Sequence, residues 1–100
     1  MILVNQHTAS AAEIVAAFAQ ENSLAMIVGV KTAGRLLSGT SFKVEHGYLL
    51  GLPVGAYLTW RGTMIEGKGV TPDVAVDLPY EALKRRRDIQ LEKAMDLAKA

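Results

Sequence analysis

The sequence predicts an α/β fold with a partly parallel sheet, short antiparallel strands and a C-terminal helix. Two all-apolar runs, residues 1–4 and 25–28, predict buried strands, and a helical pattern lies between them. A strand, a helix and a second strand in this order form a βαβ unit. Two continuously apolar strands in such a unit imply a parallel sheet that is covered on both faces. A length of 100 residues suits a single small domain.

The composition excludes several classes of protein. The formal net charge is +1, so no broad basic surface for nucleic acid is present. The chain has no cysteine, which excludes disulfides and thiolate metal sites. No apolar run approaches the roughly 20 residues that a membrane-spanning helix needs. No set of histidine and carboxylate residues has metal-ligand spacing, and we expect neither a metal nor a cofactor.

The first helix is predicted over residues 10–21, and its apolar face consists of Ile14, Val15, Phe18 and Ala19. Ser10 stands between the first strand and this helix, where unpaired N–H groups carry partial positive charge. A hydroxyl group there lies beside donors that can stabilise an oxyanion. Ser10 also begins an S-x-x-E capping box, in which the serine only closes the first turn. From these residues alone, the capping interpretation is favoured.

The loop at residues 31–35 follows the second strand, so it lies at the same sheet edge as Ser10. In open α/β sheets this edge binds ligands. Short strands are then predicted over residues 40–44 and 48–52, around a hairpin turn at Glu45-His46-Gly47, and over residues 55–60.

The last third of the chain is predicted to hold a loop, a strand and a helix. The glycines of the loop at residues 66–69 permit positive φ angles and close backbone approach. A short strand follows over residues 73–76, and a helix runs from residue 79 to the end. Its expected buried residues are Leu83, Leu91, Met95 and Leu97. The basic run at residues 84–87 is flanked by acidic residues, which favours a solvated helix face.

Four stretches occur together in an order that indicates a family. They are Ile2 to Ile14 around Ser10, Val28 to Gly34, the Gly-Val-Thr-Pro-Asp run at residues 69–73, and Asp88 to Ala94. This ordered set resembles the tail-specific, or C-terminal processing, protease family. The resemblance implies a fold related to the Clp-protease/crotonase superfamily, built from ββα units. It also implies an endopeptidase that cuts proteins near their C-termini.

The resemblance assigns roles to several residues. It makes Ser10 the nucleophile and the backbone N–H of Ala11 an oxyanion donor. In the serine–lysine branch of the family, the base is the lysine of a Thr-Phe-Gly-Lys-Gly loop. This chain has Arg35 at that position, and arginine stays protonated. Lys31, in the same loop, is a candidate substitute base.

A second branch, similar to the tricorn protease core, pairs the serine with a histidine oriented through a network that includes a late glutamate. Glu66 occupies a position that resembles this glutamate; without the resemblance, it is interpreted as a solvated loop carboxylate. The branch's histidine precedes the nucleophile strand, in a segment that this chain does not contain. His7 is expected to point to solvent or into its loop, and His46 to be a turn residue.

The family usually has a PDZ-type domain and the first half of the catalytic core ahead of this region. Residues 1–100 are therefore expected to be the C-terminal portion of a catalytic domain. The leading hypothesis is a serine endopeptidase for protein or peptide substrates, incomplete in this chain alone. The alternative is a catalytically silent protein-binding or structural module; an acyl-CoA-handling crotonase relative is less favoured. Open sheet edges favour a homo-oligomer, and the parent protein is expected outside the cytoplasm.

Overall fold

The computed structural model describes the whole chain, residues 1–100, and its centre is a three-stranded parallel sheet. The strands are β1 (Ile2–Val4), β2 (Ile27–Gly29) and β5 (Val74–Ala75), in the order β1-β2-β5. Both strand pairs are parallel. The predicted βαβ unit and parallel sheet are thus confirmed, although the second strand occupies residues 27–29 rather than 25–28.

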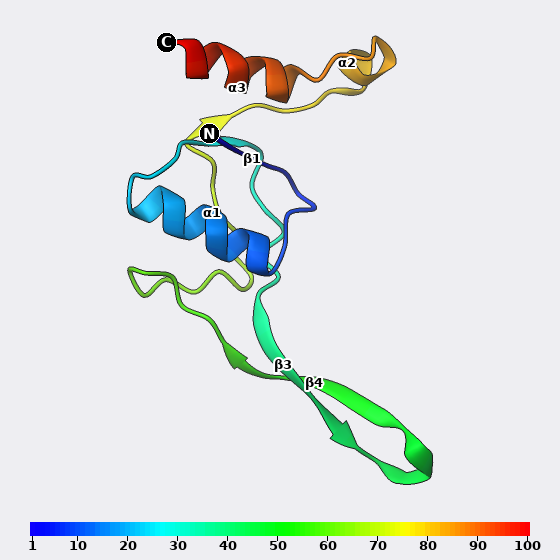
Figure 1. Ribbon diagram of the computed structural model, residues 1–100. Helices are drawn as coiled ribbons and strands as arrows, with labels where there is room; N and C mark the ends of the chain where they lie inside the picture. Colours follow the sequence, from blue (N-terminus) through cyan, green and yellow to red (C-terminus); the bar gives the residue numbers. More distant parts are fainter.

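Helices lie on the two sides of this sheet (Figure 1). α1 (Ala11–Glu21) follows β1, and α3 (Ile89–Lys99) packs against β1 and β2 on the other side. Ile27 and Val28 are both fully buried, and they point to opposite faces because side chains alternate along a strand. The central strand is therefore covered on both faces, as predicted, whereas Leu3 on the edge strand β1 is 43% exposed.

The hydrophobic core is small, and α1 contributes only alanines to it. Its seven residues are Val4, Ala16, Ala17, Ile27, Leu36, Ile65 and Val70. The predicted apolar face of α1 was wrong in three of four positions. Ile14, Val15 and Phe18 are exposed, and only Ala19 is buried. Because α1 carries apolar residues around most of its circumference, the sequence pattern could not identify the face that meets the sheet.

A long antiparallel hairpin extends from the body (Figure 1). It consists of β3 (Leu37–Lys43) and β4 (Leu49–Ala56), joined by a short 3-10 turn, η1 (Glu45–Gly47). His46 has a φ of 63° and Gly47 a φ of 77° in this turn. The predicted hairpin is confirmed, with longer strands on both sides of the turn.

The strand predicted over residues 55–60 is wrong. β4 ends at Ala56, and beyond it only Leu58 forms an isolated bridge, to Met64. The aromatic run that suggested a strand lies instead at a tight turn. This turn is closed by the hydrogen bond from the N–H of Thr59 to the carbonyl of Thr63, at 2.8 Å.

The predicted continuous C-terminal helix is also wrong, because the chain forms two helices there. α2 (Tyr80–Lys84) is followed by Arg86 in a left-handed conformation, with a φ of 56°. The carboxylate of Asp88 then accepts the N–H of Leu91 at 3.0 Å and caps α3. The aspartate cap allows a new helix to begin after Asp88. The break could not be predicted because the sequence has no glycine or proline between the two helices.

The buried side chains of α3 are small or polar. Ala94 is 5% exposed, and the side chain of Gln90 donates to the carbonyl of Val76 at 2.8 Å. The predicted buried residues are not buried: Leu83, Leu91 and Met95 are exposed, and Leu97 is half-buried. The basic run at residues 84–87 is exposed, as predicted.

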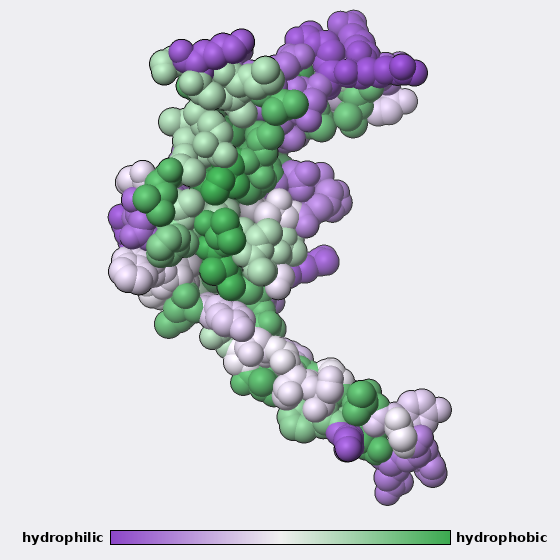
Figure 2. Space-filling model, in the orientation of Figure 1, coloured by the Kyte–Doolittle hydropathy of each residue, from purple (hydrophilic) through white to green (hydrophobic).

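The molecule is elongated and leaves much apolar surface open. Its radius of gyration is 17.0 Å, whereas a compact domain of this length has about 13 Å. Only 15 of 100 residues are buried. Figure 2 shows apolar residues across the body and along the hairpin, with polar residues at the hairpin tip and near α2. None of the helices has the length and apolar character needed to cross a bilayer.

Asp73 ties α1 to the sheet. Its Oδ2 accepts the N–H of buried Ile27 at 2.7 Å, and its Oδ1 accepts the Nε2 of Gln20 at 3.0 Å. Asp73→Ala leaves that N–H without a partner, so we expect the free energy of unfolding to fall by about 1–2 kcal/mol in urea titrations. Asp77→Ala is the control, because Asp77 bonds only the adjacent Leu78. Equal effects of the two substitutions would refute this role of Asp73.

Candidate active site

Ser10 has a strained backbone at the start of α1. Its φ is 57° and its ψ is −127°, a combination that glycine adopts readily and residues with a Cβ rarely do. The residue is exposed, and its hydroxyl forms no helix-capping hydrogen bond. The N–H of Glu13 donates to the Ser10 carbonyl instead, at 2.9 Å. The helix begins where the sequence predicted, but the hydroxyl does not close its first turn.

Glu13 is a buried carboxylate that receives four hydrogen bonds. Its Oε1 accepts the hydroxyl of Thr32 and the N–H of Gly34, both at 2.6 Å. Its Oε2 accepts the N–H groups of Ser10 at 2.9 Å and Arg35 at 3.1 Å. Burial raises the pKa of this carboxyl, but the four donors outweigh burial and hold the pKa below its ordinary value of 4.5. Glu13 therefore stays ionised and joins the helix start to residues 32–35.

The hydrogen bond from the Ser10 N–H to the Glu13 carboxylate, which is one of the two contacts of a capping box, is thus formed. It belongs to a larger network of hydrogen bonds around Glu13. The sequence pattern could indicate only the contact between Glu13 and Ser10, three positions apart. The other donors lie 19 to 22 positions further along the chain. Sequence reasoning therefore missed the role of Glu13 as the centre of the site.

Two loops pack together behind Ser10: the Thr32 loop (residues 31–36) and the Glu66 loop (residues 66–69). The hydroxyl of Thr32 also accepts the N–H of Val70, at 2.7 Å. A Cβ on Gly34 would lie only 2.8 Å from the backbone nitrogen of Gly69, so this approach requires glycine. The predicted close approach at the glycine-rich loop is confirmed.

Glu66 is half-buried and holds the Thr32 loop. Its Oε2 accepts the N–H of Leu36 at 2.5 Å. Glu66 thus holds a backbone N–H that its interpretation as a solvated loop carboxylate did not include. No histidine hydrogen-bonds to Glu66: His46 lies at the hairpin tip beside Glu45, and His7 is exposed. Its predicted role in a catalytic network stays a prediction.

Arg35 lies directly beside Ser10 along the backbone, because its carbonyl accepts the Ser10 N–H at 3.0 Å. Its side chain and that of Lys31 are exposed, and neither forms an ion pair. No base hydrogen-bonds to the Ser10 hydroxyl. No group of three or more histidine, aspartate or glutamate side chains is arranged to hold a metal ion.

A strained, exposed serine between a strand and a helix, with the helix N-terminus behind it, is the arrangement that α/β serine hydrolases use for their nucleophile. Residues 1–76 match peptidase family S41, and the chain belongs to this family. The predicted family resemblance is thereby confirmed, and so is the mixed α/β fold.

Known relatives are longer proteins. The carboxyl-terminal-processing protease of the bacterium Synechocystis sp. is 36% identical over 100 residues, which cover 97% of this chain and 23% of the relative. The photosystem II D1 C-terminal processing protease has a TM-score of 0.70 and 36% identity, over 75% of this chain and 19% of that chain. The tricorn protease shares the fold, with a TM-score of 0.88 and 22% identity. The match covers 96% of this chain and 10% of the tricorn protease chain. The chain thus spans about a quarter of the curated relatives' length.

Proposed function

We propose that this chain supplies the nucleophile of a serine endopeptidase that cuts protein or peptide substrates near their C-termini. The observation that carries the proposal is the backbone conformation of Ser10. A residue with a Cβ in this region is strained by roughly 1–3 kcal/mol, and such strain concentrates at functional sites. The hydrogen bonds of Glu13 and Arg35 to the Ser10 N–H keep the residue in place despite the strain.

In the proposed reaction, the Oγ of Ser10 attacks the scissile carbonyl carbon while its proton moves to a base. The C–N bond then breaks, the amine leaves with that proton, and water hydrolyses the acyl-enzyme. The N–H of Ala11 is the first of α1, so it has no partner within the helix. This N–H and the helix dipole would stabilise the oxyanion of the tetrahedral intermediate.

Two groups are candidates for the general base. Lys31 belongs to the loop behind Ser10 and has no ion-pair partner. The other is a histidine from another part of the protein, oriented by Glu66. Only Oε2 of Glu66 is occupied, by the N–H of Leu36, so Oε1 is available to an imidazole N–H. Arg35 is not a candidate, because a guanidinium does not give up its proton at relevant pH.

We infer that residues 1–100 are the C-terminal portion of a larger catalytic domain that supplies the second oxyanion donor. The elongated shape, the few buried residues and the quarter-length match to the relatives support this inference. The exposed apolar surface also supports self-association as a homo-oligomer. A location outside the cytoplasm is proposed from the family resemblance alone.

The test is intact mass after incubation with a fluorophosphonate, for this chain and for a longer protein that contains it. We expect a covalent adduct in the longer protein, its complete loss in Ser10→Ala, and no loss in Ser23→Ala. Ser23 is a matched control, because it is also exposed and has a φ of 54° but lies after α1. A folded longer protein that stays unlabelled would favour the catalytically silent binding module, which the lack of a base at Ser10 already supports.

A further inference from the structure

The hairpin of β3 and β4 carries most of its large apolar side chains on one face. Residues directly opposite in an antiparallel pair lie on the same face, and side chains alternate between the two faces along each strand. The register places Phe42 opposite Leu50. Val44 and Tyr48 continue this register beyond the strands, because both are extended and the N–H of Val44 donates to the carbonyl of Tyr48 at 3.0 Å. The face that contains these residues, named the apolar hairpin face, consists of Thr40, Phe42, Val44, Tyr48, Leu50 and Leu52.

The opposite face of the hairpin is smaller and more polar. It consists of Gly39, Ser41, Lys43, Leu49, Gly51 and Pro53. Leu49 is 66% exposed there, whereas Phe42 and Leu50 are each 47% exposed, because side chains on the apolar hairpin face shield one another. The apolar hairpin face carries no charged residue, and Lys43 lies on the other side. Only one face of the hairpin is therefore suited to be covered by another apolar layer.

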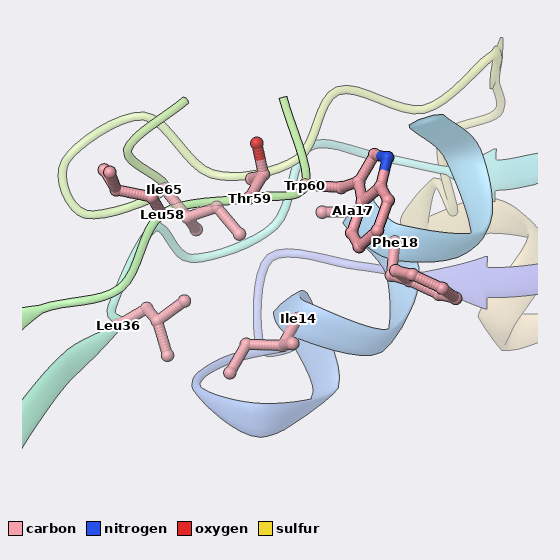
Figure 3. Close-up of a pocket in the computed structure, with 8 residues that line it drawn as sticks. All are labelled: Ile14, Ala17, Phe18, Leu36, Leu58, Thr59, Trp60 and Ile65. Atoms are coloured by element: carbon pink, nitrogen blue, oxygen red, sulfur yellow. The ribbon is translucent and has the colours of Figure 1, made fainter. Parts of the chain in front are cut away.

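Both ends of the hairpin are anchored to the body of the molecule. After β4, the chain packs against α1 and borders an apolar cavity of about 340 Å³, where the ring of Trp60 meets that of Phe18 edge to face, with centroids 6.0 Å apart (Figure 3). The Nη2 of Arg61 donates to the carbonyl of Glu21 at 2.9 Å beside it. On the other strand, Leu36 directly precedes β3 and is 2% exposed. These anchors hold the hairpin away from the body, so no part of this chain covers the apolar hairpin face.

The apolar hairpin face is large enough for a weak protein interface. Five of its six residues are large and apolar, with exposed fractions between 44% and 70%. A fully buried aromatic side chain covers about 150–250 Å², so covering this face hides roughly 500 Å² on each molecule. Two such faces together bury about 1,000 Å², which is the lower limit for a biological interface. The area therefore indicates an association that depends on concentration rather than a permanent one.

We propose that two copies of this chain pack their apolar hairpin faces against each other across a two-fold axis. A two-stranded hairpin is marginally stable in water unless its apolar face packs on another layer, and two sheets stack about 10 Å apart with their side chains interdigitated. A second copy offers a face that is equally apolar, uncharged and of the same size, as a two-fold interface requires. The proposal rests on the self-association proposed above and not on the chemistry of Ser10.

Sedimentation equilibrium of the full chain over a range of concentrations tests the proposal, and the mass should rise from monomer to dimer. Leu50→Lys places an ammonium group on the face in each copy, where burial would remove its hydration without a partner. This variant should raise the dimer dissociation constant roughly tenfold or more. Leu49→Lys is the matched control, because Leu49 is adjacent in β4 but lies on the opposite face, and it should leave the constant unchanged. Circular dichroism establishes that each variant folds, and Leu52→Lys is the second variant should Leu50→Lys not fold.

A cross-linking experiment tests the arrangement of the two copies. The chain has no cysteine, so an introduced one gives an unambiguous signal. The pair of Phe42 and Leu50 lies in the middle of the face, so a two-fold axis there separates the two copies of residue 50 by about one sheet spacing, 10 Å. Leu50→Cys should therefore form a covalent dimer with a short bismaleimide, and Leu49→Cys should remain a monomer.

Three outcomes would overturn the proposal, and none of them bears on the labelling of Ser10. The first is a chain that stays monomeric at every concentration. The second is an equal effect of the lysine substitutions at positions 49 and 50. The third is a longer, monomeric protein in which a cysteine at position 50 resists maleimide, because the face would then be covered within one molecule. A dimer that forms while the fluorophosphonate leaves Ser10 unlabelled would support this interface and count against the nucleophile.

Discussion

Glu13→Gln is expected to lower the free energy of unfolding by about 1–3 kcal/mol. The carboxylate is fully buried and accepts two donors at each oxygen. A glutamine amide keeps one acceptor oxygen, but its NH₂ group would face two of the four donors. The N–H of Ser10 would keep the carbonyl of Arg35 as its acceptor, whereas the N–H of Arg35 or of Gly34 would be left unsatisfied. Each unsatisfied buried donor costs about 1–3 kcal/mol. Urea unfolding at pH 7, followed by circular dichroism, measures the loss.

The same substitution should change how stability depends on pH. The pKa of Glu13 is lower in the folded chain than its ordinary value of 4.5, so its stabilising contribution is present above that value. This contribution is lost as the pH falls through the folded-state pKa. The stability difference between wild type and Glu13→Gln should therefore shrink as the solution is acidified from pH 7 toward pH 3.

Glu81→Gln is the control for both measurements. The Glu81 side chain is exposed and lies 4.0 Å from the ammonium of Lys84, so its substitution should change stability by less than about 0.5 kcal/mol. If Glu81→Gln lowered the free energy of unfolding as much as Glu13→Gln, this result would contradict the stabilising role of the Glu13 hydrogen bonds. So would a difference between wild type and Glu13→Gln that stays constant with pH.

Gly29→Ala is expected to destabilise the chain by more than about 4 kcal/mol, enough to prevent folding. Gly29 has a φ of 135°, and a Cβ there would lie 1.9 Å from the carbonyl oxygen of Val4, its partner in the sheet. This neighbour is backbone, so the contact cannot be relieved by a rotamer change. β1 would have to separate from β2.

Gly47→Ala is the control that distinguishes the effect of the close contact at Gly29 from the effect of a positive φ alone. Gly47 has a φ of 77°, but no atom lies within 4 Å of the position that a Cβ would take there. Its substitution should therefore cost only about 1 kcal/mol. Thermal unfolding of the two variants tests the comparison. Similar losses at Gly29 and Gly47 would show that strain alone, rather than the approach to Val4, requires glycine in the sheet.

The order of the elements could be predicted from the sequence where local patterns are strong. The apolar runs around Val4 and Val28 indicated the two parallel strands, and the turn around Gly47 indicated the hairpin. Ser10 was placed correctly at the start of a helix because a polar turn separates two apolar segments there. These features depend on residues that are close together in the chain.

The features that could not be predicted depend on distant contacts. α1 is apolar on most sides, so nothing local distinguishes buried Ala16 from exposed Val15. The strained φ of Ser10 has no sequence signature, because serine is compatible with ordinary caps. The cavity is formed by residues as far apart as Ile14 and Ile65, and no periodicity connects them.

The hydrogen bonds around Glu13 also determine when the serine can acquire its geometry. Thr32 is held by Val70, and Leu36 by Glu66, which are 38 and 30 positions away. A nascent chain that ends before Glu66 lacks both anchors, so the Thr32 loop that packs behind Ser10 is not yet fixed. Since long-range closure is slow compared with local folding, the serine geometry forms late. A partly synthesised or partly folded chain would therefore not yet hold the proposed nucleophile in its strained geometry.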